Sequence, residues 1–257
     1  MTISLDYRDQ IAVLTLGDDE NRFSPEWLDA IDGHLAEVED RALGLVTTGL
    51  GKFYSNGLDL DWLMAHGDRM QWYVGRVQAL FARILTFPLP TVAAVNGHAF
   101  GAGSMLAIAH DFRVMRADRG YFCFPEIDIR IPFTPGMAAL IQAKSMPQTA
   151  VVAMTTGHRY GGAEAHGAGL VDDTAAEDGL VEAAIARLTP IIGKDKGTLG
   201  AIKSTMYAGV LDALRTDVAG GGADDVFWLS NAYYAGYADT GRLLDVGRTL
   251  GADASEP

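Results

Sequence analysis

The sequence predicts an α/β fold that is followed by a helical C-terminal region. Short apolar runs typical of strands alternate with amphipathic segments typical of helices over the first two-thirds of the chain. After residue 178 the apolar residues recur only at helical spacing. We therefore divide the chain into an α/β core over residues 1–195 and a helical region over residues 196–257.

The predicted strands are short and rich in apolar or β-branched residues. Residues 3–7 and 11–16 flank a polar turn, which predicts two consecutive strands. Residues 91–95 give the clearest strand, because the run Thr-Val-Ala-Ala-Val ends at an Asn-Gly turn. Further strands are predicted at residues 43–47, 112–115 and 121–124, and around Leu170 and Val171.

Helices are predicted where apolar residues recur three or four positions apart. The first helix has a strong start signal, with Ser24 as N-cap and Pro25 at the first helical position. We expect Asp59 to cap a helix that begins near Leu60. Further helices are predicted at residues 70–87, from about Gly136, and at residues 149–154, 180–188, 199–214, 224–237 and 243–250.

The composition excludes several classes of function. The 257 residues are 49% hydrophobic and 21% charged, as in ordinary globular proteins with a substantial core. A formal net charge of −13 argues against nucleic acid or an anionic membrane as the main partner. Cys123 is the only cysteine, which excludes an intramolecular disulfide and a cysteine-rich metal site. We find no leader-like segment and no membrane span, so we expect a cytoplasmic protein.

The most informative stretch is a glycine loop that follows the strand at residues 91–95. Gly101-Ala102-Gly103-Ser104 opens a helix of small residues, where the first N–H groups have no carbonyl one turn earlier to bond. Such groups bind a phosphate or stabilise an oxyanion, and small side chains let the ligand approach. A dinucleotide-binding loop is disfavoured, because Leu106 stands where its third glycine is required.

Three segments in a fixed order carry a resemblance to a known family. They are Phe53-Tyr54-Ser55-Asn56-Gly57-Leu58-Asp59-Leu60, Val95-Asn96-Gly97-His98-Ala99-Phe100-Gly101-Ala102-Gly103 and Phe124-Pro125-Glu126-Ile127. Together they resemble the crotonase (enoyl-CoA hydratase/isomerase) superfamily over about residues 5–171. The resemblance implies a crotonase-like spiral of ββα units with a C-terminal trimerisation region. It also implies an acyl-CoA thioester substrate and a place in fatty acid metabolism.

The resemblance implies three catalytic positions. The backbone N–H groups of Leu58 and Ala102 correspond to the two donors of an oxyanion hole, and Glu126 corresponds to a catalytic carboxylate. Removing a proton beside a thioester carbonyl places negative charge on that oxygen, and losing one such donor typically costs about 3 kcal/mol. The carboxylate moves the proton. Its neighbours Phe122, Phe124 and Ile127 predict an apolar pocket that raises the pKa of Glu126.

Substrate contacts are expected from the same loops and from the polar loop before the first helix. The predicted substrate-binding residues are Asn21, Phe23, Lys52, Ser55, Gly57, Gly101, Gly103, Met105 and Pro125. Lys52 and Lys203 are the nearest basic candidates for the coenzyme A phosphates, because the chain after Gly220 lacks the basic ending typical of the family. Coenzyme A is part of the substrate, and no metal or redox cofactor is implied.

Met105 favours one reaction of the family over another. Family hydratases carry a second glutamate at this position, and adding water across a double bond uses both carboxylates. Moving a double bond from the 3,4 to the 2,3 position needs only one carboxylate, which takes a proton from C2 and returns it to C4. Met105 therefore favours a delta-3, delta-2-enoyl-CoA isomerase-like reaction. Residues 126–137 are also similar to monofunctional isomerases of the family.

Two alternative functions stay open at this stage. One is another acyl-CoA reaction of the family, such as hydration, with water held by Glu126 and a second group. The other is an acyl-CoA-binding protein with a degenerate site. The resemblance also implies a homotrimer or a dimer of trimers. For His98 we expect packing or a hydrogen bond rather than metal binding, and for Asp128 a turn or surface position.

Overall fold

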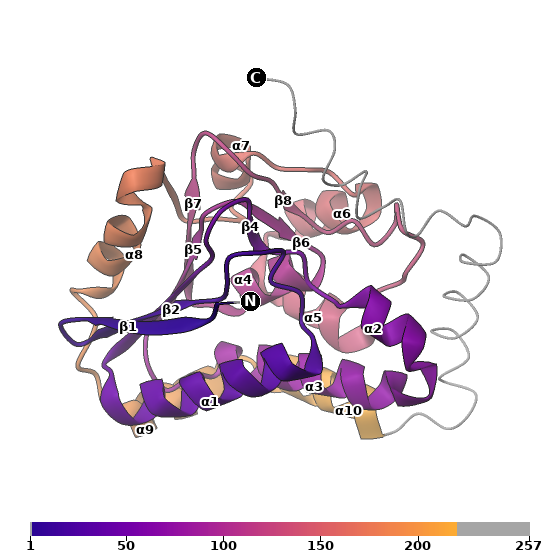
Figure 1. Cartoon of the computed structure of the whole chain (residues 1–257), viewed down its shortest axis with the longest axis horizontal. Coiled ribbons are helices and arrows are strands. Elements are labelled where there is room, and N and C mark those ends of the chain that lie inside the picture. Colours follow the sequence, from indigo (N-terminus) through magenta and orange to yellow (C-terminus); the bar gives the residue numbers. More distant parts are fainter. Residues whose placement is uncertain (1, 220–257) are drawn as a thin grey trace.

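The computed structural model describes residues 2–219, which form two parallel-rich sheets surrounded by helices (Figure 1). The helices predicted at residues 224–237 and 243–250 lie outside the described residues. Within residues 2–219, no helix combines the length and the apolar character that crossing a membrane requires.

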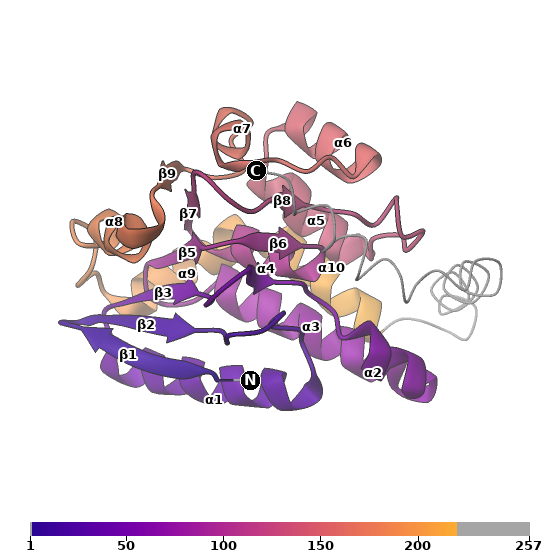
Figure 2. The same cartoon turned by 45° about the horizontal axis from the view of Figure 1, so that its top comes forward.

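The larger sheet carries the strands side by side in the order β1-β2-β3-β5-β7-β9 (Figure 2). β1 pairs antiparallel with β2, and every later pair is parallel. Its strands are β1 (Ser4–Arg8), β2 (Ile11–Thr15), β3 (Gly44–Thr48), β5 (Thr91–Val95), β7 (Phe112–Arg116) and β9 (Asp173–Ala175).

The smaller sheet has the parallel order β4-β6-β8. Its strands are β4 (Phe53–Ser55), β6 (His98–Phe100) and β8 (Phe122–Cys123). Each follows a strand of the larger sheet and precedes a helix, so the ββα unit recurs three times along the chain. Because the carboxyl ends of parallel strands meet at one edge, the loops after β4, β6 and β8 come together there.

Helices cover both faces of the larger sheet. Helix α8 packs on one face, where Leu180, Ala184 and Leu188 meet apolar side chains of β2, β3, β5 and β7. The other face adjoins the main core, which α1, α3, α4 and α5 help to build. The helices are α1 (Pro25–Arg41), α2 (Leu60–Ala65), α3 (Met70–Leu85), α4 (Ala102–Ala109), α5 (Pro135–Lys144), α6 (Pro147–Thr156), α7 (Gly162–Gly167), α8 (Leu180–Leu188), α9 (Lys196–Met206) and α10 (Ala208–Ala219).

Two helices begin at the N-cap residues that the sequence predicts. The Ser24 side chain accepts a hydrogen bond from the N–H of Trp27, and Pro25 is the first residue of α1. The Asp59 side chain likewise accepts from the N–H of Trp62 and caps α2. Both caps confirm the sequence predictions.

The strand predicted around Leu170 and Val171 is wrong. Both residues are buried, but their N–H groups donate to the carbonyl of Ala165 within α7. Their apolar character serves the core rather than a sheet, and the strand of this region is β9, two residues further on.

The single helix predicted over residues 199–214 is two helices. α9 ends at Met206, and Tyr207 has φ −109° and ψ 20° before α10 begins. The break turns α10 onto α5 and α3, where Val210, Leu211 and Leu214 are buried. The division of the chain at residue 195 stays a prediction.

Candidate active site

Two glycines bring the loop after β4 against the start of α4. Gly57 has φ +78°, and a Cβ added there would lie 2.8 Å from the backbone nitrogen of Ala102. A Cβ on Gly103 would lie 2.2 Å from the carbonyl oxygen of Ser55. Real Cβ atoms do not approach backbone atoms so closely, so only glycine lets these two segments meet. The predicted donors, Leu58 and Ala102, therefore belong to adjacent loops.

Helix α4 begins at the predicted oxyanion loop. Gly101 precedes the helix with φ +52°, and the N–H of Met105 donates to the carbonyl of Gly101 at 3.0 Å. The N–H of Ala102 lies in the first turn, where no earlier carbonyl of the helix is available to it. This end of the helix also carries the positive pole of its dipole. The arrangement suits a partly negative oxygen.

Glu126 lies beside this loop. Its side chain is 8% exposed and its Oε1 would be 3.3 Å from a Cβ added at Gly101. Its Oε2 is buried and has no hydrogen-bond partner within the described part of the chain. The carboxylate therefore lies next to the Gly101 loop, and its Oε2 makes no hydrogen bond to that loop.

Burial raises the pKa of Glu126 to about 8, and a backbone hydrogen bond partly opposes that rise. The expected increase is confirmed. Phe124 belongs to the apolar surroundings and packs edge-on against Phe122 and Phe133, with ring centroids 5.7 and 6.5 Å away. The prediction that Ile127 lines this apolar pocket is wrong, because its side chain is 54% exposed and contributes little to the burial of Glu126.

Asn21 and Ser55 hold the first donor loop, which follows β4 and contains Gly57 and Leu58. Asn21 is fully buried with φ +50°, and its Nδ2 donates to the carbonyl of Tyr54 at 3.0 Å. Ser55 Oγ donates to the carbonyl of Asn21 at 2.8 Å. The two residues thus bind the loop before α1 to the end of β4. A direct contact of either with substrate stays a prediction.

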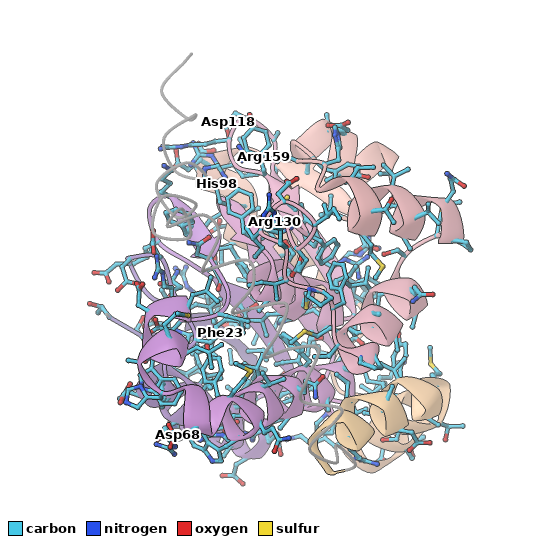
Figure 3. All side chains as sticks on the ribbon, turned by 90° about the vertical axis from the view of Figure 1, so that its right-hand side faces the viewer. Phe23, Asp68, His98, Asp118, Arg130 and Arg159 are labelled. Atoms are coloured by element: carbon cyan, nitrogen blue, oxygen red, sulfur yellow. The ribbon has the colours of Figure 1, made fainter. Side chains whose placement is uncertain are left out.

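Phe23 belongs to the same support. Its N–H donates to the carbonyl of Gly57 at 2.8 Å, while its ring stacks on Trp27 with centroids 4.6 Å apart. The side chain lies in the interior and is fully buried (Figure 3). The backbone of Phe23 therefore contacts the loop of Leu58, whereas its ring packs in the core.

Met105 and Pro125 are both enclosed by the protein. Met105 is 1% exposed and belongs to the main core, together with most of α4. Pro125 is buried next to Glu126. Asp128 is exposed and turned toward Gly157, where a Cβ would meet its Oδ2 at 2.4 Å. The surface position expected for Asp128 is confirmed.

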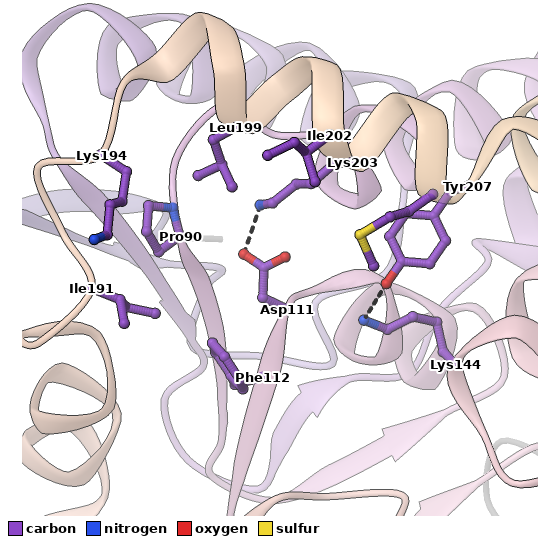
Figure 4. A pocket seen from close by; sticks show the side chains of 11 residues that line it. Pro90, Asp111, Phe112, Lys144, Ile191, Lys194, Leu199, Ile202, Lys203 and Tyr207 are labelled. Carbon is purple, nitrogen blue, oxygen red and sulfur yellow. Dashed lines mark hydrogen bonds and ion pairs between the residues drawn. The ribbon is translucent and has the colours of Figure 1, made fainter.

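Lys203 is not available to bind a phosphate, contrary to the sequence prediction. Its Nζ donates to the carbonyls of Phe87 and Leu89, both at 2.9 Å, and to Asp111 Oδ2 at 2.6 Å. The ion pair lies in the wall of a cavity of about 320 Å³ between α9 and the start of β7 (Figure 4). This cavity adjoins the start of β7, whereas the candidate site follows the ends of β4, β6 and β8.

Lys52 is the other basic candidate for the coenzyme A phosphates. It directly precedes β4, and its Nζ lies 5.5 Å from the centre of the Phe53 ring. Lys52 lies at the start of β4, whereas the loop of Leu58 follows the end of that strand, and contact with coenzyme A stays a prediction.

His98 is a packing residue, as expected. The ring stacks on Phe100 at 5.1 Å and lies 5.4 Å from the Phe53 ring. Neither ring nitrogen has a hydrogen-bond partner among the described residues. Burial lowers its pKa to about 4, so the ring is neutral at physiological pH.

Two hydroxyl groups near the site carried no sequence signal of their role. Tyr73 Oη accepts the N–H of Asp59 at 2.8 Å, next to Leu58. Ser104 Oγ lies 2.5 Å from the carbonyl of Ala99 and 2.9 Å from that of Cys123. Ser104 thereby holds the start of α4 against β6 and β8. The sequence predicts Tyr73 only as part of the helix over residues 70–87.

A buried carboxylate beside a glycine loop at a helix N-terminus is the kind of site that moves a proton next to a stabilised oxyanion. Residues 6–221 match the family described as Enoyl-CoA hydratase/isomerase. The chain belongs to this family, as the three ordered segments predicted.

Relatives include Enoyl-CoA delta isomerase 3 of Arabidopsis thaliana, which is 37% identical over 194 residues, 71% of this chain and 82% of the relative. The peroxisomal Enoyl-CoA delta isomerase 2 of the same plant is 34% identical over 84% of this chain and 93% of its own. The crystal structure of human mitochondrial delta3-delta2-enoyl-CoA isomerase matches with a TM-score of 0.83 at 21% identity, over 98% of this chain and 99% of that one. That likeness confirms the crotonase-like fold.

Proposed function

We propose that this protein isomerises 3-enoyl-CoA thioesters to trans-2-enoyl-CoA thioesters with Glu126 as the single catalytic carboxylate. The observation that carries the proposal is the placement of this buried carboxylate beside the Gly101 loop, with the apolar Met105 enclosed in the following helix. Burial and a backbone hydrogen bond account for its shifted pKa, with no contribution from a neighbouring charge in the described part of the chain. The names of the plant relatives support the same reaction.

The reaction uses the site in two proton transfers. The N–H groups of Leu58 and Ala102 bind the thioester oxygen, and Glu126 removes a proton from C2. The electron pair moves onto that oxygen to form a dienolate, which the two donors stabilise. Glu126 then returns the proton to C4, and the double bond ends between C2 and C3. The carboxylate regains its charge, so no further reactant is consumed.

A raised pKa suits a group that both accepts and donates a proton. A carboxylic acid with pKa about 8 is a stronger base than an exposed glutamate once it is ionised. It also releases the proton less readily to water in the apolar site. The same group therefore retains the proton between the two transfers.

Several further features belong to this proposal. We expect coenzyme A to enter only as part of the substrate, with no metal or redox cofactor. We also expect a homotrimer or a dimer of trimers, a role in fatty acid metabolism and a cytoplasmic location. Size measurement by light scattering tests the assembly directly.

The deciding experiment follows a trans-3-enoyl-CoA and a trans-2-enoyl-CoA in parallel, with products separated by retention and identified by mass. Conversion of the first into the second, with little 3-hydroxyacyl-CoA from either, supports the isomerase. Rapid formation of 3-hydroxyacyl-CoA contradicts it and requires a second group that activates water. Binding of both thioesters without any turnover supports a degenerate acyl-CoA-binding protein instead.

A further inference from the structure

We propose, on the basis of the function proposed above, that Ser55 and Tyr73 are positioning residues that aim the N–H of Leu58 at the thioester oxygen. Each hydroxyl binds one of the two backbone amides that flank the Leu58 amide. We name this arrangement the amide clamp, and it consists of Ser55, Tyr73 and the amides of residues 57 and 59.

The clamp leaves one amide unused among three in a row. Ser55 Oγ accepts the N–H of Gly57 at 3.0 Å, and Tyr73 Oη accepts the N–H of Asp59 at 2.8 Å. The N–H of Leu58 lies between them and has no acceptor within hydrogen-bonding distance in the described part of the chain. A buried or half-buried amide without a partner is uncommon, and a ligand oxygen would complete it.

The direction of the Leu58 N–H is set through its own peptide plane. The carbonyl of Gly57 belongs to that plane and accepts the N–H of Phe23 at 2.8 Å. In a planar trans peptide the C=O and the N–H point in opposite directions. The bond from Phe23 therefore turns the Leu58 N–H away from the loop that precedes α1. The flanking bonds to Ser55 and Tyr73 keep the neighbouring planes from rotating it back.

Both hydroxyls are themselves held in place. Ser55 is fully buried and donates its own proton to the carbonyl of Asn21, so a lone pair faces Gly57. Tyr73 is fully buried on α3, and its ring lies 5.2 Å from that of Trp62 on α2. A buried side chain with a fixed rotamer holds its partner more accurately than an exposed one. The clamp thus joins α2 and α3 to the donor loop.

The expected loss of kcat on breaking the clamp follows from the typical effect of deleting a whole oxyanion-hole donor. Deleting one oxyanion-hole donor typically lowers kcat by about 10²–10³. A donor that is present but poorly aimed should lose part of that, so we expect a fall of about 10- to 100-fold. Binding through the coenzyme A moiety does not use the clamp. KM should therefore change by less than about threefold, which separates a transition-state effect from lost binding.

The test compares Tyr73→Phe with Tyr54→Phe as a matched control. Tyr54 is equally buried, and its hydroxyl bonds Thr47 Oγ1 at 2.8 Å instead of an amide of the donor loop. Each variant loses one buried hydroxyl of the same kind. We measure kcat and KM with trans-3-hexenoyl-CoA, and thermal unfolding reports any shared loss of stability. Only Tyr73→Phe should lose kcat.

Infrared spectroscopy of a bound thioester gives a readout that a purely structural role would not change. Hexanoyl-CoA labelled with ¹³C at its carbonyl binds without reacting, and donors aimed at its oxygen lower the carbonyl stretching frequency. We expect a smaller lowering in Tyr73→Phe than in the wild type or Tyr54→Phe. Equal frequencies and equal kcat in the two variants would overturn the clamp.

The outcomes separate the clamp from the proposed reaction. A wild-type protein that lowers the carbonyl frequency but does not isomerise refutes the reaction, while the comparison of variants still decides the clamp. A wild-type protein that binds hexanoyl-CoA without any lowering, or does not bind it, overturns both. If Tyr73→Phe does not fold, Ser55→Ala releases the other flanking amide and must show the same loss of kcat and the same infrared change.

Discussion

The pH dependence of turnover gives the sharpest test of Glu126. With a pKa of about 8 in the free protein, this carboxyl is ionised to only about 1% at pH 6, about 10% at pH 7 and about 90% at pH 9. The first proton transfer needs the ionised form. We therefore expect kcat/KM to rise about tenfold per pH unit below pH 7.5, and about 50- to 100-fold between pH 6 and pH 9.

The assay measures initial rates at trans-3-hexenoyl-CoA concentrations well below KM, because kcat/KM reports the ionisation of the free protein. Formation of the conjugated thioester is followed by its ultraviolet absorbance. Asp128→Asn is the control, since Asp128 is exposed and points to Gly157. Its profile should match that of the wild type. A profile that is flat from pH 6 to pH 9 would refute the reasoning, because an exposed glutamate is already ionised over that whole range.

Three further predictions concern stability. Glu126→Gln should gain stability relative to the wild type as pH rises from about 5 to about 8, by up to about 1.4 kcal/mol per unit, because the raised pKa makes the folded wild type lose stability over that range. Urea unfolding at both pH values measures the difference, and identical pH dependence of the two proteins would contradict it. Lys203→Met should lower the free energy of unfolding by about 3 kcal/mol, because the partly buried Asp111 carboxylate loses its cation and keeps its hydrogen bonds from Thr91, while the affinity for hexanoyl-CoA stays the same. Weaker binding of hexanoyl-CoA with unchanged stability would instead support the predicted role of Lys203 in binding a coenzyme A phosphate. Gly103→Ala should lower the free energy of unfolding by about 3 kcal/mol and remove most of the activity, because the added Cβ meets the Ser55 carbonyl. Gly33→Ala, on α1 with no atom near the added Cβ, should raise the free energy of unfolding by about 0.5–1 kcal/mol. Denaturant midpoints and turnover of both glycine variants decide this, and an active, stable Gly103→Ala would show that the two loops can separate.

Features that depend on a few neighbouring residues were predictable from the sequence. The Ser24 and Asp59 caps, the strand at residues 91–95 and the raised pKa of Glu126 beside Phe124 are of this kind. The caps and the strand depend on residues within a few positions, whereas the burial that raises the pKa of Glu126 also involves the Gly101 loop.

Features that depend on distant contacts were not predictable in the same way. Lys203 is bonded to carbonyls more than a hundred positions earlier in the chain, so its sequence neighbours do not show that its charge is already used. The bend at Tyr207 arises where α10 packs on α5 and α3. Tyr73 is recognisable as a core residue by its spacing, but its bond to the Asp59 amide depends on how α3 meets the donor loop.

If the proposed function holds, the enclosure of α4 limits which parts of the fold can determine a preference for acyl-chain length. Every residue from Ala102 to Ala109 is buried, so the helix cannot shift without disturbing the packing on all sides. Side chains that retain exposure lie on α2, which follows the loop of Leu58, and in the segment of residues 127–133, which follows Glu126. Natural variants that change chain-length preference should therefore cluster in those two segments, while the helix that carries Ala102 keeps its small residues throughout the lineage.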